Sequence, residues 1–117
     1  MRVLVASLLC LLTLSAAPAA ADARSDAKKQ VEFGIAVAQR GLWREAIYRW
    51  LRAVEIDPGY AAAHNNLGIA YEHEGELGKA RAAYEKAIEL EPSNSFIKQN
   101  YELFKEINDR TTRPDSL

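Results

Sequence analysis

A repeat of 34 residues is the feature that most constrains how this chain folds. Between residues 27–60 and 61–94, nine pairs of positions at this offset carry the same residue. The pairs are Ala27/Ala61, Gly34/Gly68, Ile35/Ile69, Ala36/Ala70, Gly41/Gly75, Ala46/Ala80, Ala53/Ala87, Glu55/Glu89 and Pro58/Pro92. A constant period of this length is typical of proteins in which each unit is one helix–turn–helix stacked on the next. Such repeats usually bind other proteins and rarely catalyse reactions.

Five helices are predicted, over about 26–39, 43–56, 60–74, 77–90 and 95–108. Gly41 and Gly75 follow two of the predicted ends, where a residue without a Cβ can take the left-handed conformation that closes a helix. Pro58 and Pro92 follow the second and fourth helices, because proline cannot continue the hydrogen-bond ladder. The pattern therefore predicts two helical hairpins and a single last helix.

Gly34 and Gly68 lie inside predicted helices, where glycine costs about 0.5–1 kcal/mol relative to alanine. Because both units accept this cost at the same helical position, another helix is predicted to approach closely at each glycine. Ala46 and Ala80 are expected to face the glycines. Trp50 and Tyr84 are expected to fill the space between the units, because aromatic side chains bury a large area.

The pattern resembles the tetratricopeptide repeat, whose signature places W-x₂-L-G-x₂-Y before a small residue, an aromatic residue and proline. The second unit reads His64-x₂-Leu67-Gly68-x₂-Tyr71, then Ala80, Tyr84, Ala87 and Pro92. The first unit reads Gln30-x₂-Phe33-Gly34-x₂-Val37, then Ala46, Trp50, Ala53 and Pro58. The units depart from the signature at Gln30, Val37 and His64. The resemblance implies an all-α fold, a short right-handed α-solenoid of two helix–turn–helix units and a C-terminal capping helix.

The chain divides accordingly into a signal peptide (1–21), a linker (22–26), two repeats (27–60 and 61–94), a capping helix (95–109) and a disordered tail (110–117). In the capping helix Ile97, Tyr101 and Phe104 recur at helical spacing and are expected to pack on the second repeat. Phe96, Leu103 and Ile107 form a second apolar stripe that this packing need not cover.

The N-terminal segment resembles a secretory signal peptide. Arg2 precedes an apolar run over 3–14 and a run of small residues over 15–23, which predicts cleavage after Ala21 or, as second choice, after Ala23. The apolar run is shorter than the roughly 20 residues of a membrane-spanning helix. A periplasmic or secreted protein is therefore expected, the alternative being a membrane anchor left uncleaved. Cleavage would remove Cys10, the single cysteine, so no thiol chemistry is expected.

Charge and residue types exclude several classes of function. Cleavage removes Arg2 from 15 basic residues and none of the 16 acidic ones, so the net charge is near −2. Nucleic-acid binders are usually basic. His64 and His73 lie nine positions apart on one helix and point in opposite directions, so they cannot share a metal. No nucleophile–base set or cofactor motif appears, and we expect no enzyme activity, cofactor, metal or small-molecule substrate.

The resemblance implies that the first helix of each unit lines a concave groove in which partner proteins bind. The groove residues would be Lys28, Val31, Ile35, Gln39, Asn65, Ile69, Glu72, His73, Phe96, Gln99 and Leu103. An apolar centre with polar surroundings suits an amphipathic helix or an extended apolar peptide. In the alternative interpretation, self-association or the C-terminal tail buries these residues.

Family members that clamp the acidic tails of chaperones use a lysine and an asparagine on the first unit. Val31 and Ile35 occupy those places here, and Phe96 and Asn100 replace the cationic pair of the next helix. Only Asn66 matches, so this is no carboxylate clamp.

Two functions remain in competition. The first is a non-catalytic adaptor of the bacterial envelope that binds a protein partner in the groove. The second is a self-associating or membrane-tethered structural subunit, with Phe96, Leu103 and Trp43 as contact residues and a homo-oligomer as the product. The membrane would be involved only if the N-terminal segment stays uncleaved. The identity of the partner is not encoded in any recognisable motif.

Overall fold

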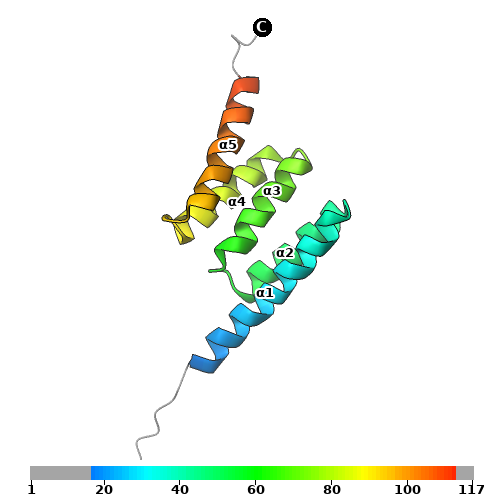
Figure 1. The fold of residues 1–117 in the computed structure, drawn as a ribbon, viewed down its shortest axis with the longest axis vertical. Helices are drawn as coiled ribbons and strands as arrows, with labels where there is room; N and C mark the ends of the chain where they lie inside the picture. The colour runs from blue at the N-terminus through cyan, green and yellow to red at the C-terminus, as the bar shows by residue number, and fades with distance from the viewer. Residues whose placement is uncertain (1–16, 113–117) are drawn as a thin grey trace, which may run out of the picture.

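The computed structural model describes the backbone of residues 17–112 and the side chains of residues 22–110. This part of the chain forms five helices and no strand. They are α1 (Ala17–Gln39), α2 (Trp43–Ile56), α3 (Ala61–His73), α4 (Leu77–Leu90) and α5 (Ser95–Thr112). Helices α1 and α2 pack as one hairpin, α3 and α4 as a second, and α5 lies against α4 (Figure 1). The fold is the predicted all-α solenoid of helix–turn–helix units.

The two glycine turns close both hairpins in the same way. Gly41 and Gly75 have φ angles of +80° and +74°, the positive values that only a residue without a Cβ adopts readily. After α1 the Leu42 amide donates to the Val37 carbonyl at 3.0 Å, and after α3 the Glu76 amide donates to the Tyr71 carbonyl at 2.8 Å. These six-residue closures are Schellman motifs, which satisfy carbonyls at the end of a helix.

The glycines inside the helices face aromatic rings, and this corrects the expectation that Ala46 and Ala80 lie opposite them. A Cβ on Gly34 would overlap the Trp50 indole, and a Cβ on Gly68 would lie 2.7 Å from Cδ1 of Tyr84. The two alanines are fully buried in the core, but the rings reach the glycines first. A small residue is needed there because a flat ring lies directly on the helix backbone.

Helix α5 closes the second unit as predicted. Ile97 packs with Ala61 and Ala87, while Phe104 packs on Tyr84 with ring centroids 5.4 Å apart. Ile97 and Phe104 are buried, and the Tyr101 hydroxyl donates to Glu85 at 2.7 Å. Within the described residues no helix is both long and apolar enough to cross a membrane.

The ends of the chain differ from the sequence-based prediction. Helix α1 begins at Ala17, so residues 22–26 are helical and not a linker, and α5 continues to Thr112, so residues 110–112 are not part of a disordered tail. Alanine-rich sequence favours helix, which explains the early start of α1. Helix α3 is one residue shorter at each end than predicted. Residues 1–16, with Cys10 and most of the predicted signal peptide, and residues 113–117 lie outside the described part of the chain.

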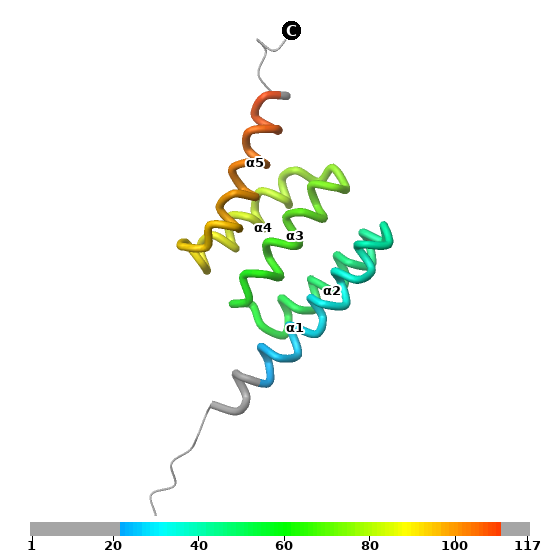
Figure 2. The backbone as a smooth tube through the Cα atoms, viewed as in Figure 1, coloured from blue at the N-terminus to red at the C-terminus, as the bar shows by residue number. Residues whose placement is uncertain are grey.

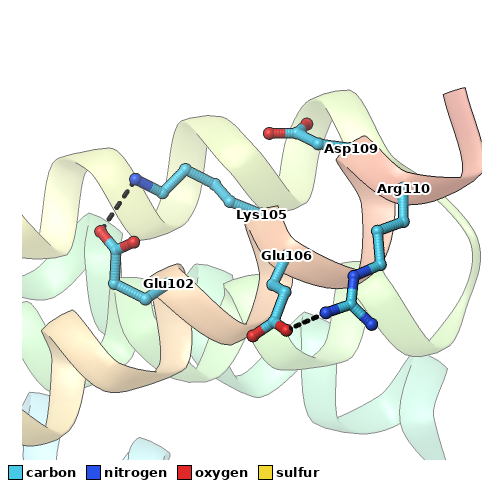
Figure 3. Close-up of a pocket in the computed structure, with 5 residues that line it drawn as sticks. All are labelled: Glu102, Lys105, Glu106, Asp109 and Arg110. Atoms are coloured by element: carbon cyan, nitrogen blue, oxygen red, sulfur yellow. Dashed lines mark hydrogen bonds and ion pairs between the residues drawn. The ribbon is translucent and has the colours of Figure 1, made fainter. Parts of the chain in front are cut away.

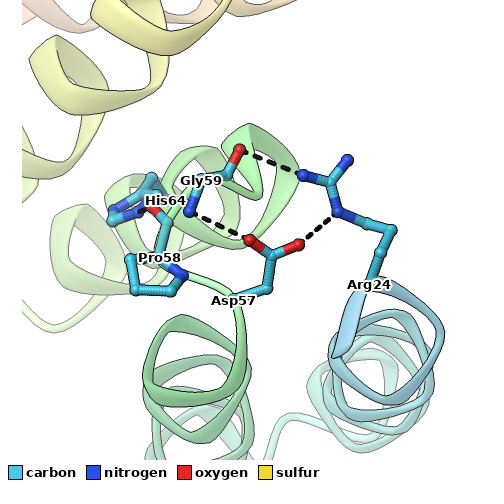
Figure 4. Close-up of polar contacts among 5 residues, drawn as sticks. All are labelled: Arg24, Asp57, Pro58, Gly59 and His64. Carbon is cyan, nitrogen blue, oxygen red and sulfur yellow. Dashed lines mark hydrogen bonds and ion pairs between the residues drawn. The ribbon is translucent and has the colours of Figure 1, made fainter. Parts of the chain in front are cut away.

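Arg24 gives the extended start of α1 a tertiary anchor. Its guanidinium forms an ion pair with Asp57 in the turn between α2 and α3 and donates to the Gly59 carbonyl at 3.3 Å (Figure 4). It also lies 4.8 Å from the centroid of the Tyr60 ring. The first helix is therefore joined to the turn that leads into the second unit.

Candidate partner-binding groove

Three apolar residues 34 positions apart mark one face of the molecule. Ile35, Ile69 and Leu103 occupy the same phase of α1, α3 and α5, which follow one another across the molecule (Figure 2). Ile35 is 40% exposed, Leu103 is 55% exposed and Ile69 is half-buried. Phe96, which lies two turns before Leu103 on the same face of α5, is 63% exposed. We call the surface formed by these four residues the groove face.

A pocket of about 300 Å³ opens on the groove face between α1 and α3. It is lined by Ile35, Ala38, Gln39, Trp43, Trp50, Asn66 and Ile69, and we call it the inter-unit pocket. None of its lining side chains is charged. Both tryptophans of the chain belong to it. Its surface is therefore apolar and aromatic, with two side-chain amides.

Two tryptophan rings of the pocket are held in place, one by a hydrogen bond and the other by stacking. The Trp50 indole N–H donates to the Val31 carbonyl at 3.1 Å, which fixes the ring against Gly34. The Trp43 ring stacks on the His73 imidazole with centroids 4.1 Å apart and planes 20° apart. Since Trp43 begins α2 and His73 ends α3, this contact also joins the two units.

The structure removes two predicted groove residues from the accessible surface. Val31 is 4% exposed and packs in the core between the units, and Asn65 is 3% exposed and accepts a hydrogen bond from the Asn100 amide at 3.2 Å. The nine remaining residues reach the surface. Lys28, Ile35, Gln39, His73, Phe96, Gln99 and Leu103 are exposed, and Ile69 and Glu72 are half-buried. Their contact with a partner stays a prediction.

The inter-unit pocket also contains residues outside the predicted groove set. The sequence predicts no binding role for Ala38 and Trp50. It predicts Trp43 only as a self-association contact, and Asn66 only matches the carboxylate clamp. Ala38 lies three positions after Ile35 and Asn66 three before Ile69, so both share the helix face of a predicted residue. This spacing was the signal that identifies them.

We call the space between α1 and α3 the first interval and the space between α3 and α5 the second interval. The residues 34 positions after the pocket residues belong to the second interval, and their chemistry differs. The equivalent positions are Ile69, Glu72, His73, Leu77, Tyr84, Asn100 and Leu103. Glu72 thus stands where the first interval has Ala38, and it accepts a hydrogen bond from the Tyr84 hydroxyl at 3.0 Å. Burial of the ring, followed by this hydrogen bond, raises the pKa of the Tyr84 phenol far above its usual range. The second interval is therefore polar and carries a carboxylate.

A cleft of about 450 Å³ runs along α5 (Figure 3) and offers only paired charges. Lys105 pairs with Glu102 at 2.8 Å, Arg110 pairs with Glu106, and Asp109 pairs with Arg81 at 3.3 Å. Pairs of this kind between exposed side chains are typical of a solvated helix surface.

A third cleft, of about 460 Å³, lies on the outer side between the units. It is lined by Arg44, Ile47, Tyr48, Leu51, Tyr71, Glu74, Glu76 and Lys79. Glu74 and Glu76 belong to the turn after α3, and the Glu76 carboxylate pairs with Lys79 at 3.4 Å. Among the residues whose side chains are described, no group of three or more His, Cys, Asp or Glu could hold a metal ion.

Comparison with known families identifies the repeats. The family described as "Tetratricopeptide repeat" matches residues 61–94, and the one described as "TPR repeat" matches residues 34–75. The chain belongs to the tetratricopeptide repeat family. The tetratricopeptide repeat is a protein-interaction fold without catalytic groups of its own, and proteins that contain it bind other proteins.

Similar proteins include ones from plants and bacteria. The chain is 32% identical over 73 residues to the chloroplastic tetratricopeptide repeat domain-containing protein PYG7 of Arabidopsis thaliana, covering 62% of this chain and 24% of that protein. It is 32% identical over 71 residues to the type IV pilus assembly protein PilF of Pseudomonas aeruginosa, covering 61% and 28%. It is 40% identical over 47 residues to the Hsp70-Hsp90 organizing protein of Triticum aestivum, covering 40% and 8%. The chain thus spans less than a third of the length of each of these relatives.

Proposed function

We propose that this protein is a non-catalytic adaptor of the bacterial envelope that binds a peptide or helix of another protein on its groove face. The observation that carries the proposal is the apolar row of Ile35, Ile69 and Leu103, extended by Phe96, together with the uncharged pocket that Ile35 and Ile69 line with both tryptophans. A contiguous exposed apolar surface on a folded domain usually marks an interaction site.

The envelope location rests on the N-terminal sequence. A short apolar run after Arg2 and the alanine-rich segment that follows it are typical of an exported bacterial protein. A bacterial relative, PilF, is named for the assembly of type IV pili, which supports a role in assembling other proteins.

Self-association is the alternative function, and one contact makes it weaker. Phe96 and Leu103 are exposed as that alternative requires, but Trp43 is half-buried and stacked on His73. Two of its three contact residues are thus exposed, and Trp43 is accessible only where it lines the inter-unit pocket. Light scattering on the purified protein distinguishes the two functions, because a monomer supports the adaptor.

Site-specific photo-cross-linking in the native cells tests the adaptor. A photoreactive benzoylphenylalanine is placed at position 103 on the groove face or, as the matched control, at position 52 on the outer face of α2. We expect the groove-face probe to capture one defined protein and the control not to capture it. Capture by the control alone, or a product that contains only this chain, contradicts the proposal. Fractionation of the same cells tests the envelope location.

A further inference from the structure

We infer that the groove face selects an extended peptide in which a large apolar residue and a lysine or arginine stand about three positions apart. The inference rests on the proposed function and specifies the partner. It follows from the difference between two neighbouring intervals of one surface, the first apolar and the second carrying Glu72.

The apolar residue belongs in the inter-unit pocket. The pocket volume of about 300 Å³ is at the lower end of binding pockets, enough for one side chain and not for a folded element. Two indole rings and two isoleucines line it, and Trp50 is already held by its hydrogen bond to Val31. An apolar side chain gains free energy there by leaving water.

The backbone of the peptide has partners at the rim of the pocket. The side-chain amides of Gln39 and Asn66 bond to no other residue in the described part of the chain, and each can both donate and accept. They stand on opposite walls, on α1 and α3. An extended peptide that crosses between these helices presents free N–H and C=O groups, whereas a helix has already used its own.

The basic residue belongs over the second interval. One carboxylate oxygen of Glu72 accepts from Tyr84, and no cation of the described residues pairs with the other. A lysine or arginine brought to this half-buried group makes a charge-assisted hydrogen bond. An acidic residue is disfavoured there, because it would meet a like charge.

The spacing follows from the packing of the helices. Successive units are joined by packed helices, α2 against α3 and α4 against α5. Packed helices lie about 8–10 Å apart, and we take this distance as the step from one interval to the next. An extended chain advances about 3.3 Å per residue. The apolar and basic residues are therefore expected about three positions apart.

The test selects a displayed library of random twelve-residue peptides on the full chain and measures affinity by tryptophan fluorescence. Because both tryptophans line the pocket, an occupied pocket changes the signal directly. We expect the selected peptides to share an apolar and a basic residue at the stated spacing. Replacing the basic residue by glutamate is expected to weaken binding at least tenfold.

Two protein variants, each with a matched control, test separately where the basic and the apolar residue of the peptide bind. Glu72→Gln keeps an acceptor for Tyr84 but removes the charge, and it is expected to weaken binding about tenfold, as for one charge-assisted bond. Glu89→Gln on the exposed side of α4 is its control. Ala38→Leu fills the pocket and is expected to abolish the fluorescence change, while Ala36→Leu, exposed on the same helix, leaves it intact. Circular dichroism confirms that each variant is folded.

The outcomes separate this inference from the proposed function. Peptides that lose binding on Leu103→Glu but lack the motif, or ignore Glu72→Gln and Ala38→Leu, overturn the inference and leave the groove as the binding surface. A library that yields no binder overturns the inference, while photo-cross-linking decides the proposed function. Peptides that ignore Leu103→Glu as well overturn both.

Discussion

Arg24 and Asp57 form an ion pair across 33 positions of the sequence and join the start of α1 to the turn between the units. The pair lies where the first helix meets the turn that leads into the second unit. The Arg24 guanidinium lowers the pKa of the Asp57 carboxyl, by its hydrogen bond first and by its charge second, and Asp57 raises the pKa of Arg24.

Removal of this pair should lower stability in a pH-dependent way. Arg24→Ala is expected to cost up to about 1 kcal/mol at neutral pH, since the arginine is half exposed. The folded pKa of Asp57 lies below its unfolded value of about 3.9, so the contribution is present above that pH and is lost as the pH falls below it. Urea unfolding at pH 7 and pH 3 measures both. Lys29→Ala, which breaks an exposed pair with Asp26, is the control. An equal loss at both pH values would contradict the assignment.

Gly68→Leu should be severely destabilising. Even a Cβ at this position lies 2.7 Å from the Tyr84 ring, and overpacking of a core typically costs about 1–3 kcal/mol or more. Thermal unfolding followed by circular dichroism measures the loss. Gly78→Ala is the matched control, because its Cβ would meet no atom within 4 Å. It is expected to keep the midpoint or raise it slightly. An unchanged midpoint for Gly68→Leu would place Tyr84 elsewhere.

Tyr84→Phe should weaken the protein at neutral pH and protect it at alkaline pH. Loss of the hydroxyl bond to Glu72 is expected to cost about 0.5–1.5 kcal/mol. The pKa of Tyr84 is higher in the folded protein than the unfolded value of about 10. Below that value the phenol makes its full contribution to the free energy of unfolding. Above it the phenol ionises in the unfolded state, which stabilises that state and lowers the free energy of unfolding. Wild-type stability should therefore fall more steeply than that of Tyr84→Phe above about pH 10. Denaturant unfolding at pH 8 and pH 11 decides this, and parallel curves would refute it.

Glutamate substitutions on the groove face should abolish partner binding without unfolding the protein. Ile35→Glu and Leu103→Glu place an unpaired carboxylate where a partner must exclude water, which is costly. Both side chains are at least 40% exposed, so helix content should be unchanged. Ile69→Glu is expected to destabilise as well, because Ile69 packs against the cluster of Tyr84 and Phe104. The yield of the photo-cross-linked partner measures binding, with the benzoylphenylalanine moved to the exposed groove position 99 so that position 103 can be varied. Arg52→Ala is the control. Loss with Arg52→Ala alone would move the site to the outer face.

Local chemistry was sufficient for much of the fold. The bounds of α2 and α4 and the positive φ angles at Gly41 and Gly75 follow the prediction, because each depends on a few neighbouring residues. Proline ends a helix and glycine closes one whatever the rest of the protein does. The helical start of α1 was missed because a signal-like pattern and a helix use the same alanines.

The candidate site was likewise predicted in part from the sequence. Helical phase placed Ile35, Ile69 and Leu103 on one face, since a 34-residue period returns each unit to the same orientation. Phase could not tell Val31 and Asn65, which are buried, from neighbours that reach the surface. Burial depends on how far a residue is rotated toward the next helix, and that rotation is set by side chains from other units.

The pattern of residues along the chain is enough to predict a stack of helical hairpins and the residues that recur from one unit to the next. It does not predict that the Trp50 ring lies on Gly34, that Arg24 reaches Asp57, or that a pocket opens in the first interval; these features come from the packing of the helices. The physical reason is that repetition is a property of spacing along the chain, whereas these contacts join residues whose distance depends on packing.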